Sequence, residues 1–221
     1  MAFRWWDRWG ALSGVLSVIL FLVFLIVFAG GPDDNDAKIV AYYAKDSNQT
    51  KQIVGFLFFF ACLLLLLLFL AYLRGVLIRA EGEPGRLTAL AYGGGVTTTV
   101  LLMVANALFV GTAITADDAG SKFKLDPNSY RLLNDTGYAV FISGVMSAIV
   151  LVAATSVLAL RTGVFPRWFG WVGIAAAVTF VVAFAFIPVF VFFGWILVAS
   201  GLLVWWLPRA RSTAAPVPAA S

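Results

Sequence analysis

Histidine is absent from this sequence of 221 residues, and cysteine occurs only once, at Cys62. Without histidine the chain cannot hold haem between two imidazoles, bind zinc or iron through imidazole, or use Ser-His-Asp or Cys-His catalysis. A single cysteine forms no intrachain disulfide and no Cys-rich metal site. Because Cys62 lies inside a long apolar run, we expect it to pack as a small buried hydrophobe. We predict neither a metal nor a cofactor.

Charge is scarce as well. Asp, Glu, Lys and Arg make up 12% of the residues and 62% are hydrophobic, with a mean hydropathy of +0.97. Soluble domains carry about 25% charged residues, so this chain has too little charge to cover a surface that faces water. We therefore predict an integral membrane protein whose partners are membrane lipids. The net charge of +4 does not indicate a nucleic-acid partner, because the basic residues are spread over short loops.

Long apolar runs fill the rest of the sequence and predict an all-α, polytopic membrane protein, a bundle of six transmembrane helices with short outer-loop helices. Every backbone group in lipid must be bonded within its own helix, which favours helical spans. The expected spans are residues 11–30, 53–73, 93–116, 138–160, 171–187 and 189–207, within one domain of residues 1–208. Residues 209–221, rich in Ala, Pro and Ser, are expected to form a disordered cytoplasmic tail.

Three span boundaries rest on local sequence. The first run is longer than the core of a signal peptide, about 7–15 residues, which favours an uncleaved first span. The glycine triplet at 93–95 interrupts the third run, so residues 87–92 are expected at the membrane interface. Pro188 divides the last run because proline lacks the backbone donor that a helix needs. A single kinked helix is the alternative there, at about twice the thickness of the bilayer.

The distribution of Lys and Arg predicts the orientation. Cytoplasmic loops carry an excess of these residues, and the side that holds both termini has nine of them against six on the other. Both termini are therefore predicted to be cytoplasmic, in a multi-pass protein of the plasma membrane. The nine are Arg4, Arg8, Arg74, Arg79, Arg86, Arg161, Arg167, Arg209 and Arg211, and the six are Lys38, Lys45, Lys51, Lys122, Lys124 and Arg131. An aromatic belt on the side of the termini would consist of Trp5, Trp6, Trp9, Trp168, Trp171, Trp205 and Trp206.

Two outer loops carry helical signals. Apolar and aromatic residues recur at helical spacing over residues 36–45, which indicates a short amphipathic helix lying on the outer membrane surface. Asp126 followed by Pro127 matches an N-cap and a first helical residue, so a helix is expected to run from there into the fourth span. The candidate contact residues of this surface are Tyr42, Tyr43 and Tyr130.

The interior of the predicted bundle is neutral, because none of the six spans contains Asp, Glu, Lys or Arg. This argues against proton pumps, ion-coupled carriers and voltage sensors, which rely on intramembrane charge. Asn106 is the one amide inside a predicted span, and Thr99 lies seven residues before it on the same helix face. The two residues either contact a ligand or form hydrogen bonds between helices, worth about 1 kcal/mol. We favour the interhelical role.

Small residues recur at the spacing of close helix contacts. Such pairs supply packing energy in lipid, where no hydrophobic drive brings helices together. We expect contacts within the bundle, and dimerisation or contact with another membrane protein is the alternative. The pairs are Gly10 with Gly14, Ser13 with Ser17, Gly144 with Ala148, and Ser143 with Ser147.

Three stretches look like parts of a known family: residues 39–44 (IVAYYA), 130–134 (YRLLN) and 161–173 (RTGVFPRWFGWVG). In the third stretch Gly163 is expected to end one helix and Pro166 to precede the next. Together the stretches resemble a family of uncharacterised six-span membrane proteins common in actinobacteria, and the likeness covers most of the chain in order. The resemblance implies a fold and a location in the bacterial inner membrane, but no catalytic residue.

Three functions remain open on this basis. We favour a non-enzymatic accessory protein, or one that binds a lipid or a small apolar ligand, with the outer loops as its contact surface. The alternative is a carrier or channel for an uncharged solute, lined by Asn106 and the threonines of the third span. A membrane enzyme that uses outer-loop carboxylates such as Asp117 or Asp126 is least favoured, because carboxylates alone restrict the chemistry.

Overall fold

Helices make up all the regular secondary structure in the part of the chain that the computed structural model describes, residues 5–181 and 187–213. The expectation of an all-α fold is therefore confirmed. The elements in chain order are α1 (Trp5–Val23), η1 (Phe24–Phe28, a π-helical turn), α2 (Asp36–Tyr43), α3 (Asp46–Glu81), α4 (Arg86–Ala119), η2 (Gly120–Lys122, a 3-10 turn), α5 (Pro127–Thr162), α6 (Arg167–Thr179) and α7 (Ile187–Thr213).

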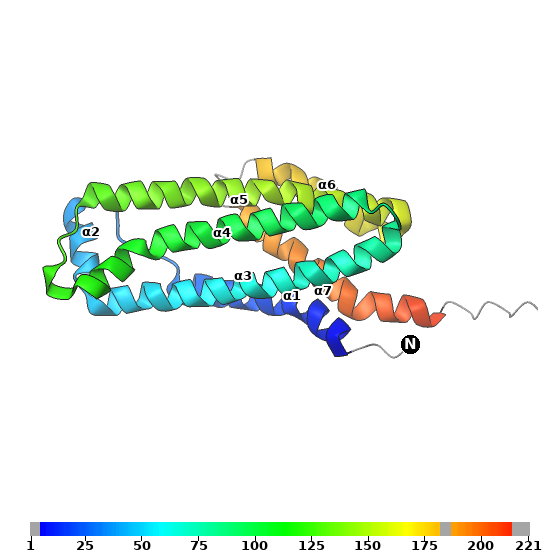
Figure 1. Ribbon diagram of the computed structural model, residues 1–221, viewed down its shortest axis with the longest axis horizontal. Helices are drawn as coiled ribbons and strands as arrows, with labels where there is room; N and C mark the ends of the chain where they lie inside the picture. Colours follow the sequence, from blue (N-terminus) through cyan, green and yellow to red (C-terminus); the bar gives the residue numbers. More distant parts are fainter. Residues whose placement is uncertain (1–4, 182–186, 214–221) are drawn as a thin grey trace, which may run out of the picture.

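Three long helices, α3, α4 and α5, run along the long axis of the molecule (Figure 1). They have 36, 34 and 36 residues, so at 1.5 Å per residue each is about 50–54 Å long, against about 30 Å for the hydrocarbon core of a bilayer. α1 packs against both α3 and α7, and α6 packs against α5. The long helices therefore extend beyond the hydrocarbon, and their ends must lie in the interface or in water.

The two ends of the bundle carry different parts of the chain. The start of α1 and the end of α7 lie at one end, together with the turns between α3 and α4 and between α5 and α6 (Figure 1). We call this the terminal end. The opposite end, which we call the loop end, carries α2 and the connection between α4 and α5.

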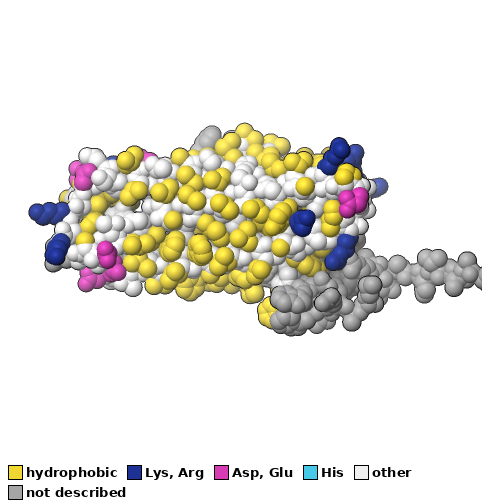
Figure 2. All heavy atoms as spheres, in the orientation of Figure 1, with side chains coloured by type: hydrophobic (Ala, Val, Ile, Leu, Met, Phe, Trp, Pro, Cys, Tyr) yellow, Lys and Arg dark blue, Asp and Glu magenta, His cyan; other side chains and the backbone are white. Residues whose placement is uncertain are grey.

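A band of apolar side chains separates the two ends. On the face that Figure 2 shows, Lys, Arg, Asp and Glu gather toward the ends, and hydrophobic side chains cover the middle. Within the described residues, five helical segments are long and apolar enough to cross a membrane: Trp9–Phe28, Asp46–Glu81, Arg86–Ala119, Pro127–Thr162 and Ile187–Trp205. The chain thus has the composition and helix lengths of a multi-pass membrane protein.

The fifth expected span, residues 171–187, differs from the structure. Its helix is α6, which has 13 residues and is about 20 Å long, shorter than the hydrocarbon core. Residues 182–186 lie outside the described ranges. α7 begins at Ile187, so Pro188 stands in the first turn of a helix rather than between two spans. A proline is tolerated there because the N–H groups of a first turn have no partner within the helix.

The second, third and fourth expected spans are also longer in the structure than the apolar runs that predicted them. Each helix continues into polar sequence at both ends. In α4 the glycine triplet at 93–95 does not interrupt the helix. Two of its three glycines allow close packing with neighbouring helices. A Cβ on Gly94 would lie 2.8 Å from the backbone nitrogen of Leu151 on α5, and a Cβ on Gly95 would lie 2.7 Å from Leu70 on α3. These two glycines let α4 approach both of its neighbours.

The terminal end carries exposed tryptophans, as an aromatic belt requires. Trp9, Trp168, Trp171 and Trp205 are all at least 48% exposed, while the side chains of Trp5, Trp6 and Trp206 lie outside the described set. α7 continues to Thr213, so residues 209–213, expected in a disordered tail, are helical. The remainder of that tail, residues 214–221, lies outside the described residues.

Local sequence sets the helix ends as expected. The side chain of Asp126 accepts hydrogen bonds from the backbone N–H groups at the start of α5, and Pro127 is the first helical residue. Gly163 ends α5 with φ of 69°, a left-handed conformation that favours glycine. Asn35, which the sequence analysis did not select, caps α2 in the same way as Asp126 caps α5.

Small residues pack the helices inside the bundle, which confirms that expectation for the pairs containing glycine. A Cβ on Gly10 would lie 2.6 Å from the ring of Tyr72 on α3. A Cβ on Gly14 would overlap the hydroxyl of Ser200 on α7. Cys62 is fully buried, as expected for a small hydrophobe, and its thiol donates to the carbonyl of Ser17 at 3.2 Å.

Gly14→Ala should lower the thermal stability of the protein in mild detergent. The added methyl group would overlap Ser200 and lie 2.7 Å from the ring of Phe69, and overpacking of this kind costs about 1–3 kcal/mol. Gly75→Ala, in α3, is the matched control because nothing lies within 4 Å of its Cβ position. Alanine favours a helix by about 0.5–1 kcal/mol, so this control should keep or raise the melting temperature measured by circular dichroism. Equal melting temperatures for Gly14→Ala and the wild type would contradict the close packing of α1.

Candidate ligand-binding site

A cavity of about 300 Å³ lies between the helices in the half of the bundle that carries α2. Residues of η1, α2, α3, α4 and α5 and the start of α7 line it. Its volume lies at the lower end of the range for small-molecule sites, roughly 300–1,000 Å³. The cavity is therefore large enough for one small or single-chain molecule.

The lining of the cavity changes from polar to apolar with depth. Along α3 it passes from Gln52, near the loop end, to Phe59, and along α5 from Tyr130 to Phe141. These steps correspond to about 10–16 Å along the helices. The apolar part includes Phe21, Phe24, Phe59, Leu102, Phe141 and Val189.

A hydrogen-bonded cluster lies at the loop end of the cavity. The hydroxyl of Tyr43 donates to Oε1 of Gln52 at 3.2 Å, and Nε2 of Gln52 donates to the hydroxyl of Tyr42 at 3.5 Å. The rings of Tyr43 and Tyr130 lie 5.5 Å apart. Tyr43 and Ile39 are almost fully buried. The helix expected over residues 36–45 is therefore present as α2, but its apolar face covers the bundle instead of lying on the lipid surface.

Two polar side chains of α5 complete the outer part of the cavity. Tyr130 and Asn134 both line it and lie one helical turn apart, on the same face of α5. The hydroxyl of Tyr130 lies 3.6 Å from the position of a Cβ on Gly31, in the segment that leads from η1 to α2. The segment between η1 and α2 therefore passes close to Tyr130.

Asn106 lies deeper, on α4, where the lining becomes aromatic. It is 5% exposed, and its Nδ2 donates to the backbone carbonyl of Phe56 on α3 at 3.1 Å. This is an interhelical hydrogen bond of the kind that holds membrane helices together. Asn106 also lines the cavity, so the same side chain that joins two helices is accessible to a bound molecule.

The end of the first membrane helix forms one wall of the cavity. There α1 gives way to η1, Phe24–Phe28, and π-helical turns are rare and often lie at functional sites. The ring of Phe24 stacks on Phe59 with the ring centroids 4.9 Å apart. A Cβ on Gly55 would lie 2.7 Å from the side chain of Phe28, so this wall packs tightly on α3.

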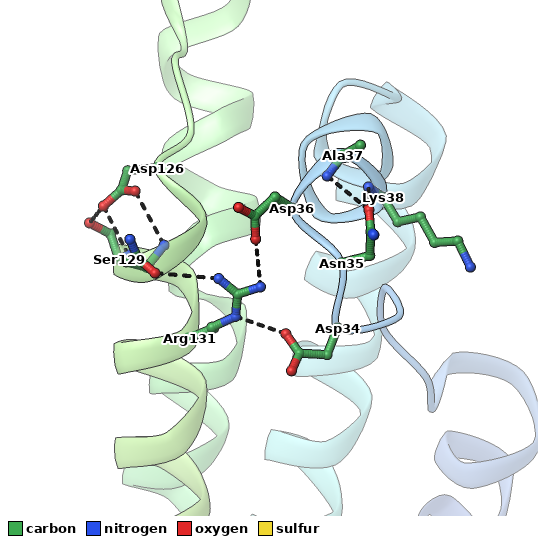
Figure 3. A network of polar contacts seen from close by, with 9 residues as sticks. Asp34, Asn35, Asp36, Ala37, Lys38, Asp126, Ser129 and Arg131 are labelled. Atoms are coloured by element: carbon green, nitrogen blue, oxygen red, sulfur yellow. Dashed lines mark hydrogen bonds and ion pairs between the residues drawn. The ribbon is translucent and has the colours of Figure 1, made fainter.

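Arg131 joins the segment before α2 and the first residue of α2 to α5. Its Nε donates to Asp34 at 2.8 Å and its Nη2 donates to Asp36 at 2.6 Å (Figure 3). A third bond, from Nη1 to the side-chain oxygen of Asn128, holds the guanidinium against its own helix at 3.3 Å. Both carboxylates are largely exposed, so water and salt screen the attraction. The arrangement orients α2 over the cavity rather than providing much of the stability.

Local hydrogen bonds set the ionisation of other groups at the loop end. The Lys38 ammonium, 2.6 Å away, lowers the pKa of Asp33. The Ser129 hydroxyl, 2.9 Å away, lowers the pKa of Asp126. Burial raises the pKa of Tyr43 well above its usual range, so its hydroxyl stays protonated and can donate a hydrogen bond.

The structure does not bring all the candidate residues together. Tyr43, Tyr130 and Asn106 line the cavity, whereas Tyr42 reaches it only through Gln52. Thr99 is fully buried, and its hydroxyl donates to the carbonyl of Gly95 on its own helix at 2.8 Å. It lies about 10 Å along α4 from Asn106 and is not among the residues that line the cavity.

Gln52 and Asn134 line the cavity although the sequence analysis did not select them. Gln52 stands directly before the expected span 53–73 and was assigned to a loop, whereas Asn134 stands four residues before the span 138–160, in the helix expected to begin at Asp126. The signal that could have found them is an amide within one helical turn before an apolar run, on the face that continues the buried side of the helix.

The carboxylates considered for an enzyme show no catalytic arrangement. Asp126 accepts two backbone N–H bonds as the cap of α5, and Asp117 is exposed near the end of α4. Among the residues that the structure describes, no three Asp, Glu or Cys side chains gather in a way that could hold a metal ion.

A second hollow lies between α4 and α5 on the side of the terminal end. Arg86, Gly93, Gly94 and Ser147 are among its lining residues, and nothing lies within 4 Å of a Cβ on Gly93. The hollow is open and shallow because glycine leaves the surface of α4 without side chains. It shares no described lining residue with the cavity at the loop end.

No protein-family model, no curated protein and no solved structure matches this chain. The fold and the cavity define a class all the same. The chain is a multi-pass, all-α protein of membrane composition, with a cavity inside its helical bundle.

Lowering the pH below about 4 should loosen the first turn of α5. The folded pKa of Asp126 lies below its unfolded value, so its contribution to stability is present above an unfolded pKa of about 3.9 and is lost as the pH falls through the folded pKa. Hydrogen exchange, corrected for intrinsic rates, should show faster exchange over residues 127–133 as the pH falls from about 5 to about 3.

Asp126→Asn is the matched control for this measurement, because asparagine is an equally good N-cap but does not titrate. The variant should keep the protection of residues 127–133 over the whole pH range. An identical pH dependence in the wild type and in Asp126→Asn would show that another group controls this turn.

Proposed function

We propose that this protein is a non-enzymatic membrane protein that binds an uncharged, lipid-like molecule in the cavity at its loop end. The main support for this proposal is the set of side chains that line the cavity. Aromatic and aliphatic side chains surround its deeper part, and Tyr43, Gln52, Tyr130 and Asn134 surround its outer part. Such a gradient suits a molecule with an apolar body and a small polar head, because ligand sites are largely apolar with a few placed polar groups.

The charges around the cavity favour a neutral ligand. None of the described lining residues is Asp, Glu, Lys or Arg, so a charged ligand would lose its hydration without gaining a counter-ion, which is costly. The two outer loops and the helix ends beside them carry eight Asp against six Lys and Arg. An anionic head group would therefore meet net negative charge as it approached.

Transport of an uncharged solute has less support. Three of the threonines expected along such a path, Thr98, Thr99 and Thr115, donate to carbonyls of their own helix. The cavity and the hollow toward the terminal end have no described lining residue in common. These two spaces, as the described residues line them, therefore do not join into one path along the bundle.

For the topology we propose six passes with both termini in the cytoplasm. The start of α1 and the end of α7 lie at the same end of the bundle (Figure 1), and two chain ends on one side require an even number of crossings. α6 would belong to the sixth. The excess of Lys and Arg favours the cytoplasm for that side, and the likeness to an actinobacterial family favours the inner membrane of a bacterium.

A monoacylglycerol that carries a diazirine in its acyl chain should crosslink to the lining of the cavity. We expect labelled peptides from α3 around Phe59 and from α4 around Leu102 in liposomes of phosphatidylcholine, and we expect excess unlabelled monoacylglycerol to reduce them. Asn134→Trp places a large side chain in the polar part of the cavity and should lower this labelling at least about tenfold, since the cavity is at the small end of the usual range.

Leu132→Trp is the matched control. It is two residues away on α5, on another helix face, and is 70% exposed, so the added ring would meet the surroundings of the protein instead of the cavity. This variant should keep wild-type labelling. Crosslinks confined to outward-facing residues such as Leu57 and Leu68, with no competition, would contradict the proposed function.

Single cysteines should report the proposed topology. In a Cys62→Ala background, Glu83→Cys lies in the turn at the terminal end and Ser47→Cys at the start of α3, at the loop end. A membrane-impermeant maleimide added to intact cells should label Ser47→Cys and should reach Glu83→Cys only after the cells are opened. The reverse pattern would invert the orientation, and labelling of both in intact cells would overturn it.

A further inference from the structure

The amide of Asn106 is bonded on one side only. Its Nδ2 donates to the carbonyl of Phe56 at 3.1 Å. A carbonyl oxygen can only accept a hydrogen bond, so this contact establishes which atom of the amide is nitrogen and which is oxygen. Nδ2 is thereby anchored to α3, and Oδ1 points away from that contact.

Within the described part of the chain, no donor reaches Oδ1 of Asn106. The buried side-chain atoms that protein encloses completely without a partner are Oγ1 of Thr155, Nε1 of Trp195 and Oγ of Ser200. Oδ1 of Asn106 is not one of them, so some of its surface remains open. Because Asn106 is 95% buried and lines the cavity, that open surface faces the cavity.

We infer that Oδ1 of Asn106 accepts a hydrogen bond from a hydroxyl group of the bound molecule. This inference rests on the proposed function and narrows the ligand to an alcohol, such as a long-chain alcohol or a partly acylated glycerol. A hydrocarbon, an ether or a fully esterified lipid would displace water from Oδ1 without replacing its hydrogen bond. Leaving a buried acceptor unpaired is the main penalty by which polar sites reject such analogues.

The surroundings of Asn106 favour a hydroxyl over other donors. The residue stands thirteen positions before the end of α4, about 20 Å from the loop end of that helix, and no carboxylate is among the described lining residues. An ammonium group would lie there without a counter-ion. An amide of the ligand would bring a carbonyl that needs a donor of its own. A hydroxyl makes one bond to Oδ1 and leaves its apolar chain among Leu102, Phe109 and Phe141.

Competition between two matched compounds tests the inference. Decan-1-ol and decyl methyl ether have the same alkyl chain, but only the alcohol can donate a hydrogen bond. Each is titrated against the diazirine monoacylglycerol on the wild-type protein. The alcohol should compete at about tenfold lower concentration, the ratio that corresponds to one hydrogen bond to a buried group.

Asn106→Leu should abolish this preference, so that the alcohol and the ether compete at equal concentrations, because leucine offers no acceptor. Asn106→Met serves the same purpose with a more flexible side chain if the leucine variant does not fold. Thr99→Val, on the same helix and equally buried, is the matched control and should keep the tenfold preference.

The outcomes separate the two proposals. Equal competition by the alcohol and the ether in the wild type would overturn the role of Asn106 and leave the proposed function standing. A preference for the alcohol that survives in Asn106→Leu would assign hydroxyl recognition to another group and equally overturn the inference. Absence of competed labelling by the monoacylglycerol itself would refute the proposed function, and the inference would fall with it.

Discussion

The close approach of helix backbones at small residues is the constraint on which the rest of this structure depends. In lipid, apolar side chains gain nothing from leaving the solvent, so helices are held by dense packing and by a few hydrogen bonds. The absence of a side chain at Gly14 allows α7 to pack closely on α1, and its absence at Gly94 allows α4 to pack against the backbone of α5. Because these contacts recur along the molecule, α3, α4 and α5 stay together over lengths well beyond the hydrocarbon core. The cavity lies where the long helices are less closely packed, and amides and aromatic rings make up much of its lining.

The loop end shows how the same chain builds a cover for that region. The buried face of α2, with Ile39 and Tyr43, lies on the ends of the long helices, and Arg131 holds its first turn through two carboxylates. The apolar contact keeps α2 against the bundle in water, and the exposed ion pairs set the orientation of α2. Tyr43 and Gln52 lie at the polar end of the cavity, and aromatic side chains line its deeper part. This change from polar to aromatic lining along the bundle is the basis for the proposed amphipathic, uncharged ligand.

Sequence alone predicted the parts that depend on composition and on local signals. The scarcity of charge predicted membrane helices, and the residues around Asp126 and Gly163 predicted where α5 begins and ends. Hydropathy did not predict the helix lengths, because an apolar run marks the part in contact with lipid and polar residues continue the same helix. Three of the five candidate site residues do line the cavity, but Gln52 and Asn134 were missed because each lies just outside the apolar run that marked its span. Thr99 lies on the same helix face as Asn106 but is buried away from the cavity, because a shared helix face does not mean a shared environment.

The extra length of α3, α4 and α5 makes membrane thickness a variable for this protein. Rigid helices of this size cannot shorten, so a bilayer adapts to them or lets them tilt, at a cost of a fraction of a kcal/mol per ångström. In a thin bilayer Gln52 and Tyr130 lie outside the layer of acyl chains. The proposed ligand would then have to reach the cavity through water. A thick bilayer raises its head groups to that level, and the proposed ligand would then arrive from the bilayer itself. The lipid composition of the membrane would thus determine whether the proposed ligand exchanges with water or with the bilayer.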